Sequence, residues 1–157
     1  MKVKIGVLGP HDTNEREYRL GVELGEEIAR AGAILLCGGL DGMMEAAAKG
    51  VRQAGGESIG ILPGDGAEGV NPYIDTAIPT GLGMYRNALL VRACDAVIAV
   101  RGAYGTLSEI AFALRAKVPV VGLETWTLLR DGEVDPGINL AETPREAVAL
   151  ALSLARR

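Results

Sequence analysis

A chain of 157 residues is long enough to bury one hydrophobic core, and we expect a single domain over residues 1–157. Apolar residues make up 48% of the chain and charged residues 23%, which is typical of a globular protein, and no apolar run approaches the roughly 20 residues that span a bilayer. The net charge of -4 and the aromatic content of 4% argue against a nucleic-acid partner, because such sites need clustered cations and stacking rings.

The two cysteines, Cys37 and Cys94, lie in apolar stretches and show neither CxxC nor Cys/His spacing. We therefore expect reduced core thiols in a cytoplasmic protein, and no metal site. The N-terminal segment "MKVKIGVLG" has too short an apolar core to be a signal peptide, and it is typical of a first strand.

Short apolar runs alternate with stretches of helical period along the chain. The expected strands are residues 2–8, 33–37, 57–62, 95–100 and 119–123, with a short extended piece at 76–80. The expected helices are residues 15–31, 42–54, 84 to 93 or 94, 106–116, and a last one that begins at an N-cap, Thr143, followed by Pro144. The segment 126–139 is assigned no element.

Strands this apolar are buried on both faces when helices separate them along the chain. The pattern therefore predicts a Rossmann-like, doubly wound α/β fold, with a mostly parallel sheet and helices on both faces. Neither GxGxxG nor GxxxxGK[ST] occurs, which argues against an NAD dehydrogenase and a nucleoside triphosphatase.

Glycines number 22, about twice the usual share, and several follow directly on expected strands. The carboxyl ends of parallel strands meet at one edge of the sheet, where open α/β proteins bind ligands. Backbone N–H groups without a neighbouring Cβ can approach a phosphate there, although tight turns alone would also explain the glycines. The candidate phosphate-binding residues are Gly9, Gly38, Gly39, Gly42, Gly102, Gly105 and Thr106.

The stretch "RGAYGTLSEI" at residues 101–110 has two interpretations. Thr106 and Glu109 have the spacing of a capping box, in which the threonine is the N-cap and the glutamate bonds back to it. The second is a phosphate-facing turn, which does not exclude the first, because a threonine hydroxyl at a helix start can also contact a phosphate. Glu109 then either completes the cap or faces a sugar, and the sequence does not choose between these two roles.

Arg86, near the start of an expected helix, suits bidentate recognition of phosphate, although a lone helical arginine is more often a solvated surface charge. The only histidine, His11, lies in the loop after the first strand, where it could touch a ligand, although an exposed loop residue is the expectation. It has no serine or cysteine partner that would indicate a catalytic triad.

Four motifs, "GGLDGMMEAAAKG", "IGILPG", "MYRNALLVRACDAVIAV" and "RGAYGTLSEI", occur in the order found in the LOG-like Rossmann proteins of the SLOG superfamily. The chain resembles this family from about Lys2 to Leu123. The family includes cytokinin-activating phosphoribohydrolases, molybdenum cofactor carrier proteins and uncharacterised bacterial proteins once labelled lysine decarboxylases. The resemblance implies a homodimer that binds an AMP-like nucleotide or a molybdopterin-type ligand.

The phosphoribohydrolases carry a PGGxGTxxE motif and an upstream arginine followed by lysine. The residues that keep the motif are Gly102, Gly105, Thr106 and Glu109. Arg101 replaces the proline and Ala103 the middle glycine, while Arg86 matches the arginine and Asn87 stands where the lysine would be. This pattern is closer to the uncharacterised bacterial and cofactor-carrier branch.

Two functions follow from these residues. In the first, the protein is a carrier or sensor that binds a nucleotide-like ligand by its phosphate. In the second, it is a nucleoside 5′-monophosphate phosphoribohydrolase, needing no cofactor, whose catalytic residues are Arg86 and Glu109. A third interpretation is a structural or regulatory subunit. Decarboxylation with pyridoxal phosphate is rejected, because no lysine falls on the glycine-rich edge.

Overall fold

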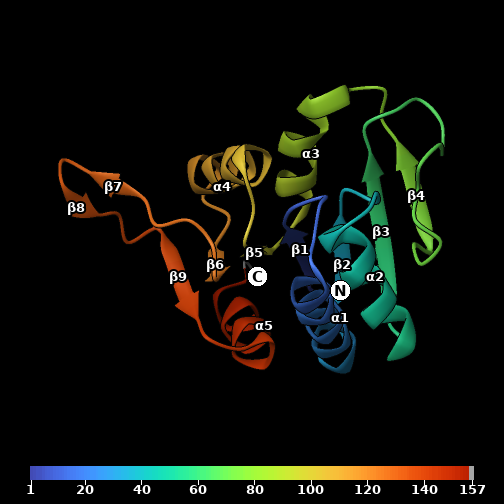
Figure 1. The fold of residues 1–157 in the computed structure, drawn as a ribbon, viewed down its shortest axis with the longest axis horizontal. Helices are drawn as coiled ribbons and strands as arrows, with labels where there is room; N and C mark the ends of the chain where they lie inside the picture. The colour runs from blue at the N-terminus through green and yellow to red at the C-terminus, as the bar shows by residue number, and fades with distance from the viewer. Residues whose placement is uncertain (156–157) are drawn as a thin grey trace.

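The computed structural model describes residues 1–155, which form a seven-stranded parallel sheet in the order β4-β3-β2-β1-β5-β6-β9 with helices on both faces (Figure 1). The predicted α/β, Rossmann-like fold is confirmed. No helix in this range is long and apolar enough to cross a membrane.

The strands of the sheet are β1 (Lys4–Leu8), β2 (Ile34–Cys37), β3 (Glu57–Leu62), β4 (Thr76–Pro79), β5 (Ala96–Val100), β6 (Val120–Leu123) and β9 (Ile138–Ala141). The helices are α1 (Glu15–Arg30), α2 (Met43–Gln53), a short 3-10 turn η1 (Gly83–Tyr85), α3 (Arg86–Ala93), α4 (Tyr104–Ala116) and α5 (Pro144–Leu154). A hairpin of β7 (Leu129–Arg130) and β8 (Glu133–Val134) projects from one side of the molecule (Figure 1).

The order of the strands reverses at β1. The chain starts in the middle of the sheet, runs outward through β2 and β3 to β4, and then returns to pair β5 with the free side of β1. The loops that leave β1 and β5 at their carboxyl ends therefore turn in opposite directions and leave a crevice between them. Ligands of open α/β sheets bind at such a reversal.

The two faces of the sheet carry separate apolar clusters. One packs under α1, α2 and α5 and the other under α3 and α4, on opposite sides of the sheet in Figure 1. Strand β5 is buried along its whole length: Ile98 and Val100 belong to the first cluster, and Val97 and Ala99 to the second. Both cysteines are buried thiols in these clusters.

The structure differs from the sequence-based assignments at the start of α4, at β9, and at the β7–β8 hairpin, which falls in the segment that was assigned no element. Helix α4 begins at Tyr104, two residues before the expected start at Thr106. Strand β9 was not predicted, because it is a four-residue edge strand whose Leu140 side chain is 74% exposed, so it lacks the continuous apolar run of the inner strands.

Helices α1 and α2 pack so closely that glycine is required at their contact. A Cβ at Gly25 would lie 2.0 Å from the backbone oxygen of Ala47, and one at Gly50 would lie 1.9 Å from the oxygen of Val22. Backbone atoms cannot give way as a flexible side chain can, so the two helices would have to separate.

Substitution Gly25→Ala should therefore destabilise the fold. Alanine gains about 1 kcal/mol of helix propensity over glycine, but overpacking against backbone costs roughly 1–3 kcal/mol or more, so the steric effect wins. Thermal unfolding should show a lower Tm for this variant. Gly64→Ala is the control, since its Cβ would find its nearest neighbour at 3.8 Å and should leave Tm nearly unchanged. An unchanged Tm for Gly25→Ala would contradict the close packing.

Candidate functional site

A cavity of about 620 Å³, here called the large cleft, opens at the carboxyl edge of the sheet beside the strand-order reversal. Four segments build it: the loop after β1, the loop from β2 into α2, the start of α3 and the start of α4. Its walls are Gly9, Pro10, His11, Asp12, Leu40, Asp41, Met44, Arg86, Asn87, Ala103, Gly105, Thr106 and Glu109.

Five of the nine candidate site residues line this cleft, namely Gly9, Arg86, Gly105, Thr106 and Glu109. The other four candidates, Gly38, Gly39, Gly42 and Gly102, are not among the residues that line it. A Cβ at Gly38 would lie 2.6 Å from a terminal nitrogen of Arg86, and one at Gly42 would lie 2.4 Å from the backbone oxygen of His11. A side chain at either position would collide with a wall residue, so glycine is required there for Arg86 and His11 to occupy their places.

Arg86 is a buried cation rather than a solvated surface charge, with only 8% of the residue exposed. Its Nε donates to the backbone oxygen of Ile61 at 2.7 Å, and a terminal nitrogen donates to the oxygen of Gly38 at 3.3 Å. The other terminal nitrogen donates to the side chain of Asn87. Burial lowers the pKa of Arg86, and the neighbouring Glu109 opposes that shift. The ends of β2 and β3 thus fix the guanidinium in the wall.

Glu109 lies in the second turn of α4 and is 8% exposed. Burial raises its pKa to about 7, against a smaller opposing effect of Arg86. Within residues 1–155, its carboxylate makes no hydrogen bond, and no fully buried side-chain oxygen or nitrogen is left without a partner. The carboxylate is therefore reached from the cleft.

The capping-box interpretation of Thr106 and Glu109 is wrong. The N-cap of α4 is Ala103, which has no side chain to cap the helix, and Thr106 lies within the first turn. The spacing T-x-x-E fits a capping box, but the backbone enters the helix two residues earlier and turns both side chains toward the cleft wall.

The start of α4 consequently keeps unsatisfied donors. The first backbone N–H groups of a helix have no acceptor within the helix, and no side chain among residues 1–155 caps this one. Helices α1 and α5 differ, because Asn14 and Thr143 cap them. A Cβ at Gly105 would meet nothing within 4 Å, so the backbone there lies open to the cleft. The arrangement favours an anion at this helix start.

His11 is an exposed loop residue, as expected, and it is also part of the wall. Other wall residues were not expected from the sequence. Asp41 and Met44 were part of a motif that carried the family resemblance, but only the fold shows that they reach the cleft. Within residues 1–155, no cluster of His, Cys, Asp or Glu is placed to hold a metal ion.

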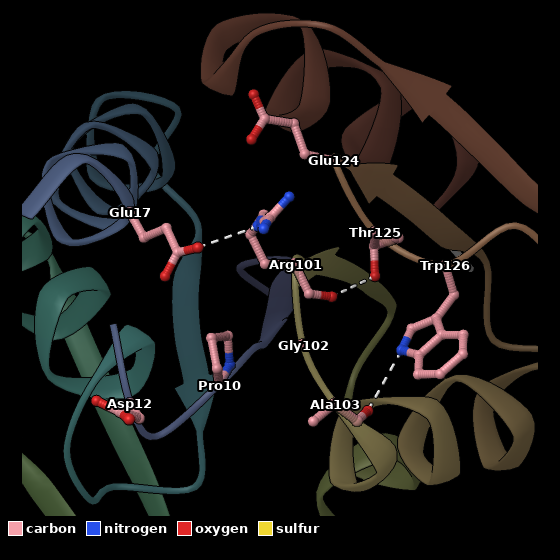
Figure 2. Close-up of a pocket in the computed structure, with 9 residues that line it drawn as sticks. All are labelled: Pro10, Asp12, Glu17, Arg101, Gly102, Ala103, Glu124, Thr125 and Trp126. Carbon is pink, nitrogen blue, oxygen red and sulfur yellow. Dashed lines mark hydrogen bonds and ion pairs between the residues drawn. The ribbon is translucent and has the colours of Figure 1, made fainter. Parts of the chain in front are cut away.

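A second cavity of about 480 Å³, here called the small cleft, lies on the other side of the turn that joins β5 to α4 (Figure 2). Its walls are Pro10, Asp12, Glu17, Arg101, Gly102, Ala103, Glu124, Thr125 and Trp126. It shares Pro10, Asp12 and Ala103 with the large cleft, so the two cavities adjoin at the ends of β1 and β5.

Comparison with known proteins agrees with the family resemblance. The SLOG cluster4 family model matches residues 2–148. An uncharacterised protein of Archaeoglobus fulgidus is 40% identical over 151 residues, which cover 96% of this chain and 95% of that protein. The structure of a molybdenum cofactor binding protein from the phototrophic bacterium Rippkaea orientalis superposes with a TM-score of 0.88 at 34% identity, over 98% of each chain.

A probable cytokinin riboside 5′-monophosphate phosphoribohydrolase of Oryza sativa is 36% identical over 106 residues. The match covers 65% of this chain and 47% of that protein, so the chain spans about half the length of the plant enzyme.

The raised pKa of Glu109 should be visible in the stability of the protein. A carboxyl with a pKa near 7 when folded and 4.5 when unfolded binds its proton more tightly in the fold, so stability falls as pH rises through that window. Glu109→Gln removes the cost of ionising this buried carboxyl. The free energy of unfolding of the variant, relative to that of wild type, should therefore rise by up to about 3 kcal/mol between pH 4.5 and pH 8.

Chemical denaturation of both proteins at the two pH values measures this gain. A difference between variant and wild type that does not change with pH would show that Glu109 titrates normally in the fold.

Proposed function

Because the chain belongs to the SLOG cluster4 family, we propose that it binds a small phosphate-bearing ligand of the nucleotide or pterin type in the large cleft, as a carrier or sensor. The observation that carries this proposal is a buried arginine, fixed by backbone carbonyls, in the same wall as an uncapped helix start. A buried cation and unsatisfied N–H donors facing one cavity favour an anion as its occupant.

The phosphate is assigned to the start of α4. Gly105 leaves the backbone open, and the Thr106 hydroxyl, which bonds no group within residues 1–155, adds a donor. Arg86 faces the same cavity from α3 and supplies the positive charge. Charge-assisted hydrogen bonds of this kind contribute roughly 1.5–3 kcal/mol each.

The ring of the ligand is assigned to the opposite wall, between the loops after β1 and β2. Leu40 and Met44 offer an apolar surface there, and Asp12 and Asp41 offer carboxylates. Pterins and purines present N–H donors around a flat ring, which this combination of groups suits. The close structural match to a molybdenum cofactor binding protein supports a pterin among the candidates.

We expect Arg86→Gln to weaken binding of AMP by tenfold or more, because it removes the buried positive charge, while Arg92→Gln, on the exposed side of the same helix, leaves binding unchanged. Isothermal titration with AMP, GMP and a reduced pterin phosphate measures this. Arg86→Lys is a further variant, because it keeps the positive charge. The Tm of each variant shows whether a loss of binding reflects a loss of folding.

If none of these ligands binds at millimolar concentration, or if Arg86→Gln binds as tightly as wild type while folded, the proposed site is wrong.

A second function is favoured by one observation, the protonatable carboxyl of Glu109 in the cleft wall. In a phosphoribohydrolase, Arg86 and the α4 start would hold the 5′-phosphate. Protonated Glu109 would give its proton to the base as the N-glycosidic bond breaks, and water attacking the ribose would return a proton to the carboxylate. With a pKa near 7, Glu109 can both donate and accept a proton near neutral pH.

If the protein hydrolyses AMP or an N6-substituted AMP, Glu109→Gln should abolish release of base and ribose 5-phosphate while it still binds the nucleotide. The wild-type rate should fall as pH rises through about 7, because Glu109 loses the proton that it must donate. Chromatography of the products follows both effects. Glu133→Gln, an exposed substitution in the β7–β8 hairpin, is the control. Unimpaired turnover in Glu109→Gln would rule out this mechanism.

We also propose that two copies associate in the cytoplasm, as the family resemblance implies. Large apolar side chains stay exposed on η1, α3 and α4, on the sheet face that the large cleft adjoins: Met84, Tyr85, Leu89, Tyr104 and Phe112. These elements pack against one another, and exposed apolar side chains on neighbouring elements favour an association site.

A further inference from the structure

The two clefts meet at the point where the strand order reverses. Pro10 and Asp12, after β1, and Ala103, between β5 and α4, belong to the walls of both cavities. The start of α4, where the phosphate is assigned, therefore lies between them. In doubly wound sheets, a ligand at this position can extend over both halves of the sheet. A mononucleotide in the large cleft would leave the small cleft without an occupant.

The small cleft contains a cation with free donors. Arg101 donates from Nε to Glu17 at 3.1 Å, while its terminal nitrogens bond nothing within residues 1–155. Figure 2 shows its side chain between Glu17 and Glu124. Its own backbone oxygen accepts a hydrogen bond from Thr125 Oγ1 at 2.6 Å, which ties the arginine to the loop after β6. A guanidinium held this way is suited to a second phosphate.

An aromatic ring stands beside that cation. The indole of Trp126 lies at the edge of the cleft in Figure 2, and its Nε1 donates to the backbone oxygen of Ala103 at 3.3 Å. The ring of Tyr104 lies 6.0 Å away, tilted by 33°. The hydrogen bond fixes the indole to the same turn that presents the α4 start. Fixed indole rings are platforms on which nucleobases stack.

The remaining polar groups suit a sugar. Asp12 makes no ion pair or hydrogen bond within residues 1–155 and lies on the boundary between the clefts. Glu124 is held by two hydrogen bonds from Arg16, at 2.5 and 3.0 Å. Carboxylate oxygens are acceptors for the hydroxyl donors of a sugar.

We propose that the ligand of this protein is a dinucleotide, with two ring-bearing units joined by a pyrophosphate. One unit lies in the large cleft and the pyrophosphate crosses the start of α4 beside Arg101. The second unit lies in the small cleft, with its sugar near Asp12 and its ring against Trp126. This inference rests on the proposed function, because the first unit occupies the phosphate site described there.

The test compares ligands that differ by one part at a time: AMP, ADP and diadenosine 5′,5′-pyrophosphate, with the guanine series in parallel. Titration calorimetry should show the dinucleotide binding about tenfold more tightly than ADP, because only it carries a second ring to stack. Trp126 is the only tryptophan of the chain, so quenching of its fluorescence reports directly on the small cleft. The dinucleotide should quench it, and AMP should not.

Two variants complete the test. Trp126→Leu should reduce dinucleotide affinity to that of ADP, and Trp126→Phe, which keeps an aromatic face, should retain most of the gain. Arg101→Gln should weaken the dinucleotide and leave AMP unchanged, whereas Arg86→Gln should weaken both.

The outcomes separate the two proposals. If AMP binds through Arg86 but the dinucleotides of both series bind no more tightly than the diphosphates, the dinucleotide inference is wrong and the proposed function stands. The same holds if AMP quenches Trp126 as strongly as the dinucleotide does. If no nucleotide of either series binds, the dinucleotide inference is wrong, and the proposed function fails with it only if the reduced pterin phosphate does not bind either.

Discussion

The pairing of β1 with β5 is the constraint on which both clefts depend. Their parallel register runs from Ile5 opposite Ala96 to Leu8 opposite Ala99, so the two strands end side by side at the same edge. The loops that follow diverge toward opposite faces of the sheet, and the cavities form where they part. A shift of this register would separate Gly9 and Pro10 from Ala103 and would destroy both walls together.

The large cleft is built at a cost in stability. An arginine and a glutamate buried in one wall are both desolvated, which lowers the pKa of Arg86 and raises that of Glu109. Backbone carbonyls of β2 and β3 offset part of the cost for the arginine, but the glutamate has no such compensation within residues 1–155. Uncompensated polar groups that face a cavity are typical of sites that await a ligand.

The sequence predicts the scaffold better than the site. Strands such as β5 are recognisable because burial on both faces makes them continuously apolar, whereas the edge strand β9 is only four residues long, includes Asn139 and an exposed Leu140, and was missed. The role of Glu109 could not be decided, because T-x-x-E spacing occurs both at a helix cap and within a helix, as it does here between the first and second turns of α4. The small cleft could not be predicted from the sequence. Trp126 belongs to a stretch without periodicity, and only the fold brings it to the same cavity as Arg101.

The most direct test of this account is a crystal structure of the protein with AMP bound. The account predicts the phosphate at the start of α4, within hydrogen-bonding distance of the backbone N–H groups of Gly105 and Thr106, with Arg86 in the same wall. A phosphate bound elsewhere, with the start of α4 in contact only with solvent, would contradict the claim that this helix start and Arg86 form the binding site.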